Sequence, residues 1–104
     1  MSDTEHNIAM RMYRTRGEVV LAACDRDILG MYFEEGDLHI HVRKEFYFES
    51  FVSDQTFLNS IKMATIVNLV GKHVVDLAIE HGFIDEDNVI WISGIPHAQM
   101  VMML

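Results

Sequence analysis

The sequence has little of several residue types that often mark a function. Its single cysteine, Cys24, excludes an intramolecular disulfide and a cysteine-based zinc site. Its eight Lys and Arg residues face 16 Asp and Glu residues, a net charge of -8, and such a surface repels phosphate backbones. No apolar run approaches the ~20 residues that a membrane span needs, and residues 1–6 are acidic and polar where a signal peptide would be basic and then apolar. We therefore expect a cytoplasmic protein.

The composition is nevertheless that of a folded chain. Half of the 104 residues are hydrophobic and 23% are charged, which excludes general disorder. We expect a flexible tail over residues 1–7 and a single α+β domain over residues 8–104. The sequence contains no glycine-rich phosphate loop and no HExxH pattern, so we predict neither a cofactor nor a metal and favour a function without catalysis.

Alternating apolar residues predict most of the strands. Ile8, Met10 and Met12 alternate with polar residues, Arg16-Gly17 supplies a turn, and residues 19–24 are apolar on both faces, a pattern typical of a β-hairpin with one inner strand. We expect further strands from Leu38 to Val42, over residues 89–92 and over residues 98–103.

Between these strands the sequence predicts two smaller features. Asp25 is expected to cap a short helical turn that ends at Gly30. An aromatic cluster over residues 46–51 is expected to close one edge of the core.

A long helical pattern follows. Ser53 is typical of an N-cap, the pattern runs to His81 with a break or kink near Lys62, and Gly82 is the usual left-handed residue after a helix. The sequence therefore predicts a two-layer α+β fold, in which one long helix packs on one face of a mostly antiparallel sheet of about four to six strands.

The first candidate site lies within this predicted helix. Gly71 would cost roughly 1 kcal/mol relative to alanine in a helix interior, and a buried Asn68 needs hydrogen-bond partners. Two interpretations stay open: a close helix-to-sheet crossing, which is favoured, or a carboxamide presented to a ligand. The segment 94–99, which contains Pro96, is predicted to be a stiff loop that presents His97 and Gln99. We therefore name Asn68, His97 and Gln99 as candidate ligand-binding residues, although a structural corner explains the loop equally well.

Other candidates have simpler explanations. Arg11, Arg14 and Arg16 cluster around one turn and could contact an anion, but three solvated arginines are favoured. His39 and His41 share a strand face as two metal ligands would, yet no third ligand is placed, so the solvent face of a strand is favoured. Cys24 with His97 could form a dyad, but an inert thiol is favoured because Cys24 ends a buried strand.

The C-terminal segment is apolar on both faces. Met100, Val101, Met102, Met103 and Leu104 would form a pairing surface for a partner protein or a second copy if they lie in an edge strand.

Four segments together carry a resemblance: residues 24–30, the Phe46-Tyr47 pair, residues 64–71 and residues 94–99. They resemble the small archaeal proteins grouped as domain of unknown function family 424, from about Ile8 to Val101. The resemblance implies a cytoplasmic archaeal protein with a compact mixed α and β fold, and it suggests a link to translation. It implies no activity, substrate or catalytic residue.

Three hypotheses about function follow. The first is a non-enzymatic accessory or protein-binding module, associated with translation. The second is a small-molecule or nucleotide-binding protein, or an enzyme, with a pocket at Asn68, His97 and Gln99. The third is RNA binding through Arg11, Arg14 and Arg16.

Overall fold

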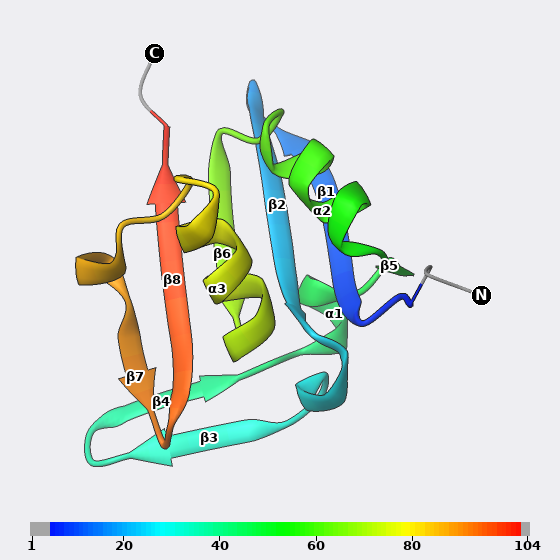
Figure 1. Ribbon diagram of the computed structural model, residues 1–104. Coiled ribbons are helices and arrows are strands. Elements are labelled where there is room, and N and C mark those ends of the chain that lie inside the picture. Colours follow the sequence, from blue (N-terminus) through cyan, green and yellow to red (C-terminus); the bar gives the residue numbers. More distant parts are fainter. Residues whose placement is uncertain (1–4, 103–104) are drawn as a thin grey trace.

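The computed structural model describes residues 5–102, and its centre is a mixed six-stranded sheet (Figure 1). Its strands, in their order across the sheet, are β5 (Ser50–Val52), β1 (Ile8–Thr15), β2 (Glu18–Asp25), β6 (Ile66–Val70), β8 (Ile95–Val101) and β7 (Ile90–Ile92). The β2–β6 pair is parallel and the other pairs are antiparallel. The hairpin predicted over residues 8–24 is confirmed as β1 and β2, which pair over their full lengths.

Two short helices cover one face of this sheet. These are α2 (Asp54–Ile61) and α3 (Lys72–Glu80), and Figure 1 shows both on the same side of the strands. Ser53 is confirmed as the N-cap of α2, because its hydroxyl accepts a hydrogen bond from the backbone N–H of Thr56. The core beneath the helices is formed by fully buried side chains that include Leu21, Phe57, Ile61, Val67, Leu69 and Val74.

A second group of elements covers part of the opposite face. It consists of the 3₁₀ turn η1 (Arg26–Ile28), the two-stranded hairpin of β3 (Tyr32–Glu35) and β4 (Leu38–His41), and the short helix α1 (Lys44–Tyr47). In Figure 1 the hairpin crosses the end of the sheet at which β8 begins. The core on this face includes Ala22, Cys24, Val42, Tyr47 and Val70.

The prediction of one long helix on one face of the sheet is wrong. Helix α2 ends at Ile61, close to the expected break at Lys62, but the chain then continues as the central strand β6 before α3 begins. Val67 and Leu69 enter the core under the helices, whereas Val70 enters the opposite core. A strand that is apolar on both faces has no period of two, so its pattern cannot be told from that of a buried helix.

The prediction of a loop over residues 94–99 is also wrong. Only Gly94 belongs to a turn, while Ile95–Val101 form β8 between β6 and β7. Pro96 lies where β6 ends, and its carbonyl accepts a 2.9 Å hydrogen bond from Gly71 N–H. The N–H that proline lacks is not needed there, because the carbonyl of Gly71 accepts instead from Val75 N–H at 3.1 Å in the first turn of α3.

The ends of the chain fall partly outside the described residues. Residues 1–4 of the predicted tail lie there, as do Met103 and Leu104 of the predicted C-terminal surface. Within the described part, the carbonyl of Asn7 accepts a 2.8 Å hydrogen bond from Arg26 N–H. No helix among residues 5–102 has the length and apolar character needed to cross a membrane.

Candidate functional site

Asn68, His97 and Gln99 come together on the sheet face opposite α2 and α3. Asn68 lies directly across from Gln99 in the β6–β8 register, and Val70 lies across from His97. The hydroxyl of Tyr47 donates a 2.7 Å hydrogen bond to Asn68 Oδ1, and Nε2 of His97 lies 3.2 Å from the same oxygen. Because Oδ1 carries no proton, the His97 ring must be the donor. The three residues predicted as a site therefore form one cluster, with Tyr47, expected only in an aromatic core, as a fourth member.

The two donors hold the Asn68 carboxamide in one orientation. Burial lowers the pKa of His97, so the ring is neutral at pH 7. Burial also raises the pKa of Tyr47, with smaller contributions from Cys24 and Tyr13, so the phenol keeps its proton. Both hydrogen bonds end on Oδ1 of Asn68, so neither uses the two N–H donors of its amide, and the half-buried Asn68 lies across from the exposed Gln99. The cluster can therefore present oriented amide groups to a partner.

Exposed apolar side chains surround these amides. Val101 is 63% exposed and lies across from Ile66, and Ile90 is 51% exposed and lies across from His97. We call the surface formed by Ile66, Asn68, Ile90, His97, Gln99 and Val101 the open face. It combines polar donors with apolar contacts, as binding surfaces do.

The open face ends at a strand edge that is unpaired in the described structure. The carbonyl of Pro96 accepts from Gly71 N–H, and Met102 N–H donates to Thr65 O at 2.7 Å, so even-numbered residues of β8 direct their backbone groups toward β6. Because these directions alternate along a strand, the backbone N–H and C=O groups of Gln99 and Val101 point away from β6, to the side of β8 on which β7 lies. There β7 pairs only with residues 95–97, and among residues 5–102 no strand pairs with that side of residues 98–101. We call this segment, Gln99–Val101, the free edge.

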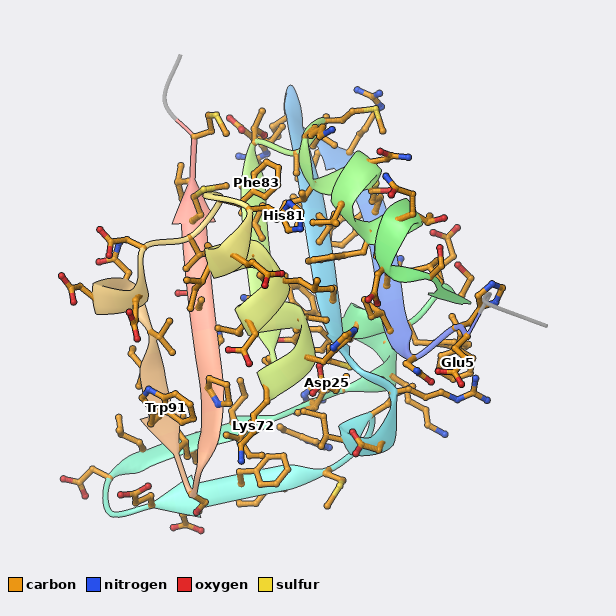
Figure 2. All side chains as sticks on the ribbon, viewed as in Figure 1. Glu5, Asp25, Lys72, His81, Phe83 and Trp91 are labelled. Atoms are coloured by element: carbon orange, nitrogen blue, oxygen red, sulfur yellow. The ribbon has the colours of Figure 1, made fainter. Side chains whose placement is uncertain are left out.

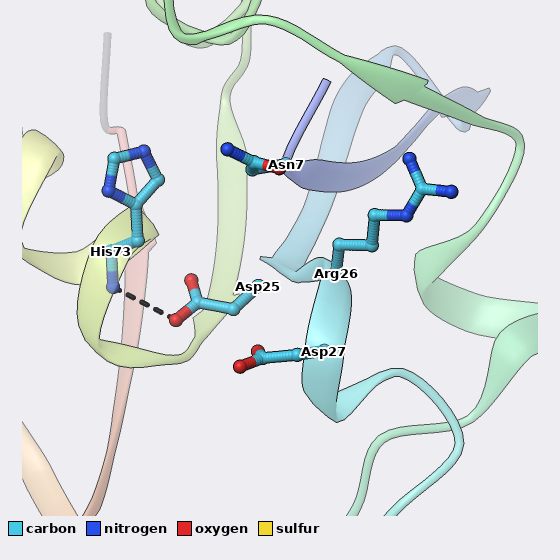
Figure 3. Close-up of a pocket in the computed structure, with 5 residues that line it drawn as sticks. All are labelled: Asn7, Asp25, Arg26, Asp27 and His73. Atoms are coloured by element: carbon cyan, nitrogen blue, oxygen red, sulfur yellow. Dashed lines mark hydrogen bonds between the residues drawn. The ribbon is translucent and has the colours of Figure 1, made fainter. Parts of the chain in front are cut away.

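A separate pocket lies at the carboxyl end of β2 (Figure 3). Its volume is about 560 Å³, and it is lined by Asn7, Asp25, Arg26, Asp27 and His73. Since β2 and β6 are parallel, their carboxyl ends meet here and α3 begins beside them. Ligands of open α/β sheets often bind at such a position.

The central carboxylate of this pocket already has a structural role. Oδ2 of Asp25 accepts a 3.0 Å hydrogen bond from His73 N–H, which Figure 3 marks, and Oδ1 accepts one of 3.0 Å from Val74 N–H. Asp25 thus caps the N-terminus of α3 from a neighbouring strand, and Figure 2 shows it beside the start of that helix. Burial raises the pKa of Asp25, although the two N–H donors oppose this shift.

Two other side chains that line the pocket, those of Arg26 and His73, also contact other groups of the protein. Nη1 of Arg26 donates to the carbonyl of His6 at 3.1 Å, and its guanidinium lies 3.9 Å from the centre of the Phe51 ring. Nε2 of His73 lies 2.7 Å from Asp54 Oδ1. Among residues 5–102, no three His, Cys, Asp or Glu side chains are grouped to hold a metal ion. These contacts favour a structural over a ligand-binding role for the pocket.

A comparison of the sequence with protein families shows the family to which the chain belongs. The model of the family described as "Protein of unknown function (DUF424)" matches residues 13–103. The chain belongs to the DUF424 family. No curated protein matches the sequence of this DUF424 protein. Its fold is similar to the crystal structure of an uncharacterized conserved protein from Methanopyrus kandleri, with a TM-score of 0.74, 21% identity, and coverage of 93% of this chain and 94% of the other.

The four segments that resemble the family meet in two places in this DUF424 protein. Asp25 from the first segment contacts the turn that contains Gly71, and a Cβ atom on Gly71 would lie 2.4 Å from Asp25 Cγ. Tyr47, Asn68 and His97 come from the other three segments and form the hydrogen-bonded cluster. Asp25 was expected to cap the short turn after β2, but its side chain makes no such bond and reaches α3 instead.

The arginines are not gathered on one face of the DUF424 protein. Arg11 donates to the carbonyl of Glu45 and lies 5.2 Å from the centre of the Tyr13 ring. Alternation along β1 directs Arg14 to the opposite face, and Arg16 occupies the turn with a φ of 51°. His39 and His41 do share one face of β4, where both rings contact Tyr32.

Proposed function

We propose that this DUF424 protein is a non-enzymatic binding module that docks an extended segment of another protein along its free edge. The observation that carries the proposal is the short length of β7, which leaves the outward backbone groups of Gln99 and Val101 without a strand partner among residues 5–102. Strand addition to a sheet edge supplies affinity through main-chain hydrogen bonds, and neighbouring side chains supply specificity. The exposed side chains of the open face are suitably placed for the second role.

A second copy of the chain is a less suitable partner than a different protein. Each copy carries a net charge of -8, so two copies repel each other at moderate salt. Exposed edges are commonly protected from self-association by shortness and charge. The free edge has both protections, because it is short and lies beside the acidic turn η2 (Glu86–Asn88).

A proline substitution tests strand addition without disturbing the fold. The N–H of Val101 faces away from β6, so Val101→Pro removes a donor from the free edge but no hydrogen bond from the β6–β8 ladder. Val101→Thr keeps the N–H and is the matched control. Immobilised wild type and both variants would be exposed to a lysate of the organism that encodes the protein, and retained proteins would be quantified by mass spectrometry.

The expected result is a protein retained by wild type and Val101→Thr but reduced roughly five- to tenfold with Val101→Pro. Far-UV circular dichroism and the thermal midpoint should confirm that both variants fold. Equal retention by all three proteins would contradict strand addition. Native mass spectrometry that reveals a dimer sensitive to Val101→Pro would instead assign the free edge to a second copy.

A small-molecule site is the second candidate function. It is favoured by the fixed orientation of the Asn68 carboxamide, whose N–H donors are not used by Tyr47 or His97, and by the exposed Gln99 across from it. A thermal-shift screen with nucleotides and metabolites, repeated on Asn68→Ala and His97→Ala, tests it. A compound that raises the midpoint of wild type but of neither variant would support this site, and a screen without a hit would contradict it.

A role in translation, in the cytoplasm, is supported only by the family resemblance. The proteins retained in the lysate experiment test it directly. Ribosomal proteins or translation factors that depend on the free edge would support this role, and partners from other processes would contradict it.

A further inference from the structure

Acidic side chains lie beside the proposed docking edge. Ile90 is opposite His97, so the line of β7 would continue past Ala98 and Gln99 if the chain stayed extended. Instead the chain before β7 forms η2, so Asp85, Glu86 and Asp87 lie within five residues, along the chain, of Ile90, the partner of His97. Figure 1 shows this turn projecting from the side of β8. An extended segment on the free edge would therefore have one end on the side of η2, and we call Asp85, Glu86 and Asp87 the acidic rim.

A second acidic group lies at the far end of β7. Strand β3 contacts β7, and the Glu35 carboxylate accepts a 2.6 Å hydrogen bond from Ser93 N–H in the β7–β8 turn. Glu34 lies beside it, and its carbonyl accepts a 2.6 Å hydrogen bond from Ser93 Oγ. Acidic residues thus flank β7 at both ends, with the acidic rim before the strand and Glu34 and Glu35 at the turn after it.

Few bases offset these charges. Residues 45–104 contain only Lys62 and Lys72, and both are associated with the helix-covered face, at the end of α2 and the start of α3. Figure 2 shows Lys72 below α3 and Trp91 on β7. Arg14 and Arg16 belong to the β1–β2 hairpin, which is separated from β8 by β6. Around β7, on the side of β8 where the free edge lies, acidic residues therefore outnumber basic ones.

From this charge distribution we infer that the segment docked on the free edge is basic, with Lys or Arg residues alternating with apolar residues. This inference rests on the proposed strand addition and specifies the chemistry of the partner. Apolar side chains on one face of the segment would contact Val101, its neighbour on β8, and the basic residues nearest η2 would contact the acidic rim. Complementary charge of this kind raises the association rate and suppresses acidic competitors.

Three short, end-capped peptides would test the inference: alternating Lys-Val, alternating Thr-Val and alternating Glu-Val. Each would be titrated into isotope-labelled full-length protein, and amide shifts would be followed by NMR. We expect the Lys-Val peptide to shift the amides of Gln99 and Val101 and to bind roughly tenfold more tightly than the Glu-Val peptide, with a preference that weakens as salt is added.

Two variants with matched charge changes test whether the acidic rim causes the preference for the Lys-Val peptide. The double variant Glu86→Gln/Asp87→Asn should reduce the preference for the Lys-Val peptide roughly threefold or more. Glu45→Gln/Glu49→Gln also removes two exposed charges, in α1 and directly before β5, away from β8, and should leave the preference unchanged. An equal effect of the two changes would contradict a role for the acidic rim.

The outcomes separate this inference from the proposed function. Equal binding of the Lys-Val and Thr-Val peptides, with shifts at Gln99 and Val101, would overturn the basic partner and leave strand addition standing. The absence of shifts at Gln99 and Val101 with every peptide would overturn both proposals. Shifts confined to acidic residues would also overturn both, because they would indicate charge attraction without docking at the edge.

Discussion

Replacement of Gly71 by alanine should destabilise the protein far more than such a small change usually does. Gly71 has a φ of 121° and a ψ of 149°, a region that residues with a Cβ atom rarely adopt, at a cost of about 1–3 kcal/mol. The new Cβ would also lie 2.4 Å from Asp25 Cγ. The Asp25 side chain would have to move and release the N–H groups of His73 and Val74, which adds about 1–3 kcal/mol.

The sum is a loss of about 2–6 kcal/mol, a large fraction of the ~5–15 kcal/mol by which native proteins are stable. A double-mutant cycle separates the two contributions. In an Asp25→Ala background the steric conflict is absent, so Gly71→Ala should cost only the backbone strain. The coupling free energy between the two sites should therefore be about 1–3 kcal/mol.

Urea denaturation followed by far-UV circular dichroism measures each free energy of unfolding. Gly17→Ala is the matched control, because Gly17 also has a positive φ, of 83°, but nothing lies within 4 Å of the position that a Cβ atom would occupy there. Its cost should stay near 1–2 kcal/mol, about that of a left-handed alanine. Two results would refute the assignment of Asp25 as the cap of α3. The first is that Gly71→Ala costs no more stability than Gly17→Ala, and the second is that the free energies in the double-mutant cycle are additive.

Two further predictions concern titration and reactivity. Because burial lowers the pKa of His97, the unfolded chain binds a proton at this residue more readily than the folded chain does. The free energy of unfolding should therefore fall as the pH drops below about 6.5. NMR titration of the ring should give a pKa below that value, and an unshifted pKa would contradict the burial of the ring. Burial, with smaller effects of Asp25 and Asp27, raises the pKa of Cys24 to about 12. The thiol should therefore resist alkylation by iodoacetamide at about pH 8 in the folded protein and react when the protein unfolds. Rapid labelling of the native protein would contradict this prediction, because it would show that the thiol is accessible.

Local patterns were sufficient to predict several elements. The Ile8–Met12 alternation and the Arg16-Gly17 turn predicted the β1–β2 hairpin, because residues close in sequence determine both the turn and the register. Ser53 was correctly predicted as a cap for the same reason. The segment around Asn68 was wrongly predicted to be helical, since β6 is buried on both faces and its sequence lacks the alternation of a half-exposed strand.

The candidate cluster was predicted only in part. Asn68, His97 and Gln99 were named because polar residues among apolar neighbours need partners. Tyr47 was missed as a partner because an aromatic residue in an apolar segment indicates core, and nothing local marks its hydroxyl as the donor to Asn68, 21 residues away. The prediction that Asp25 caps the turn after β2 was wrong, because its side chain caps α3 instead, through His73, 48 residues further along the chain.

By itself the sequence determined the family, the acidic charge, the first hairpin and the residues whose polarity requires an explanation. The tertiary structure decided what those residues contact. The sheet places β2, β6 and β8 side by side although they are separated along the chain, and only this arrangement brings Asn68 to His97 and Asp25 to α3. It also keeps β7 short, so that no strand in the described part of the chain pairs with the free edge of β8. Such contacts depend on how distant elements pack, and no local preference of the chain specifies them.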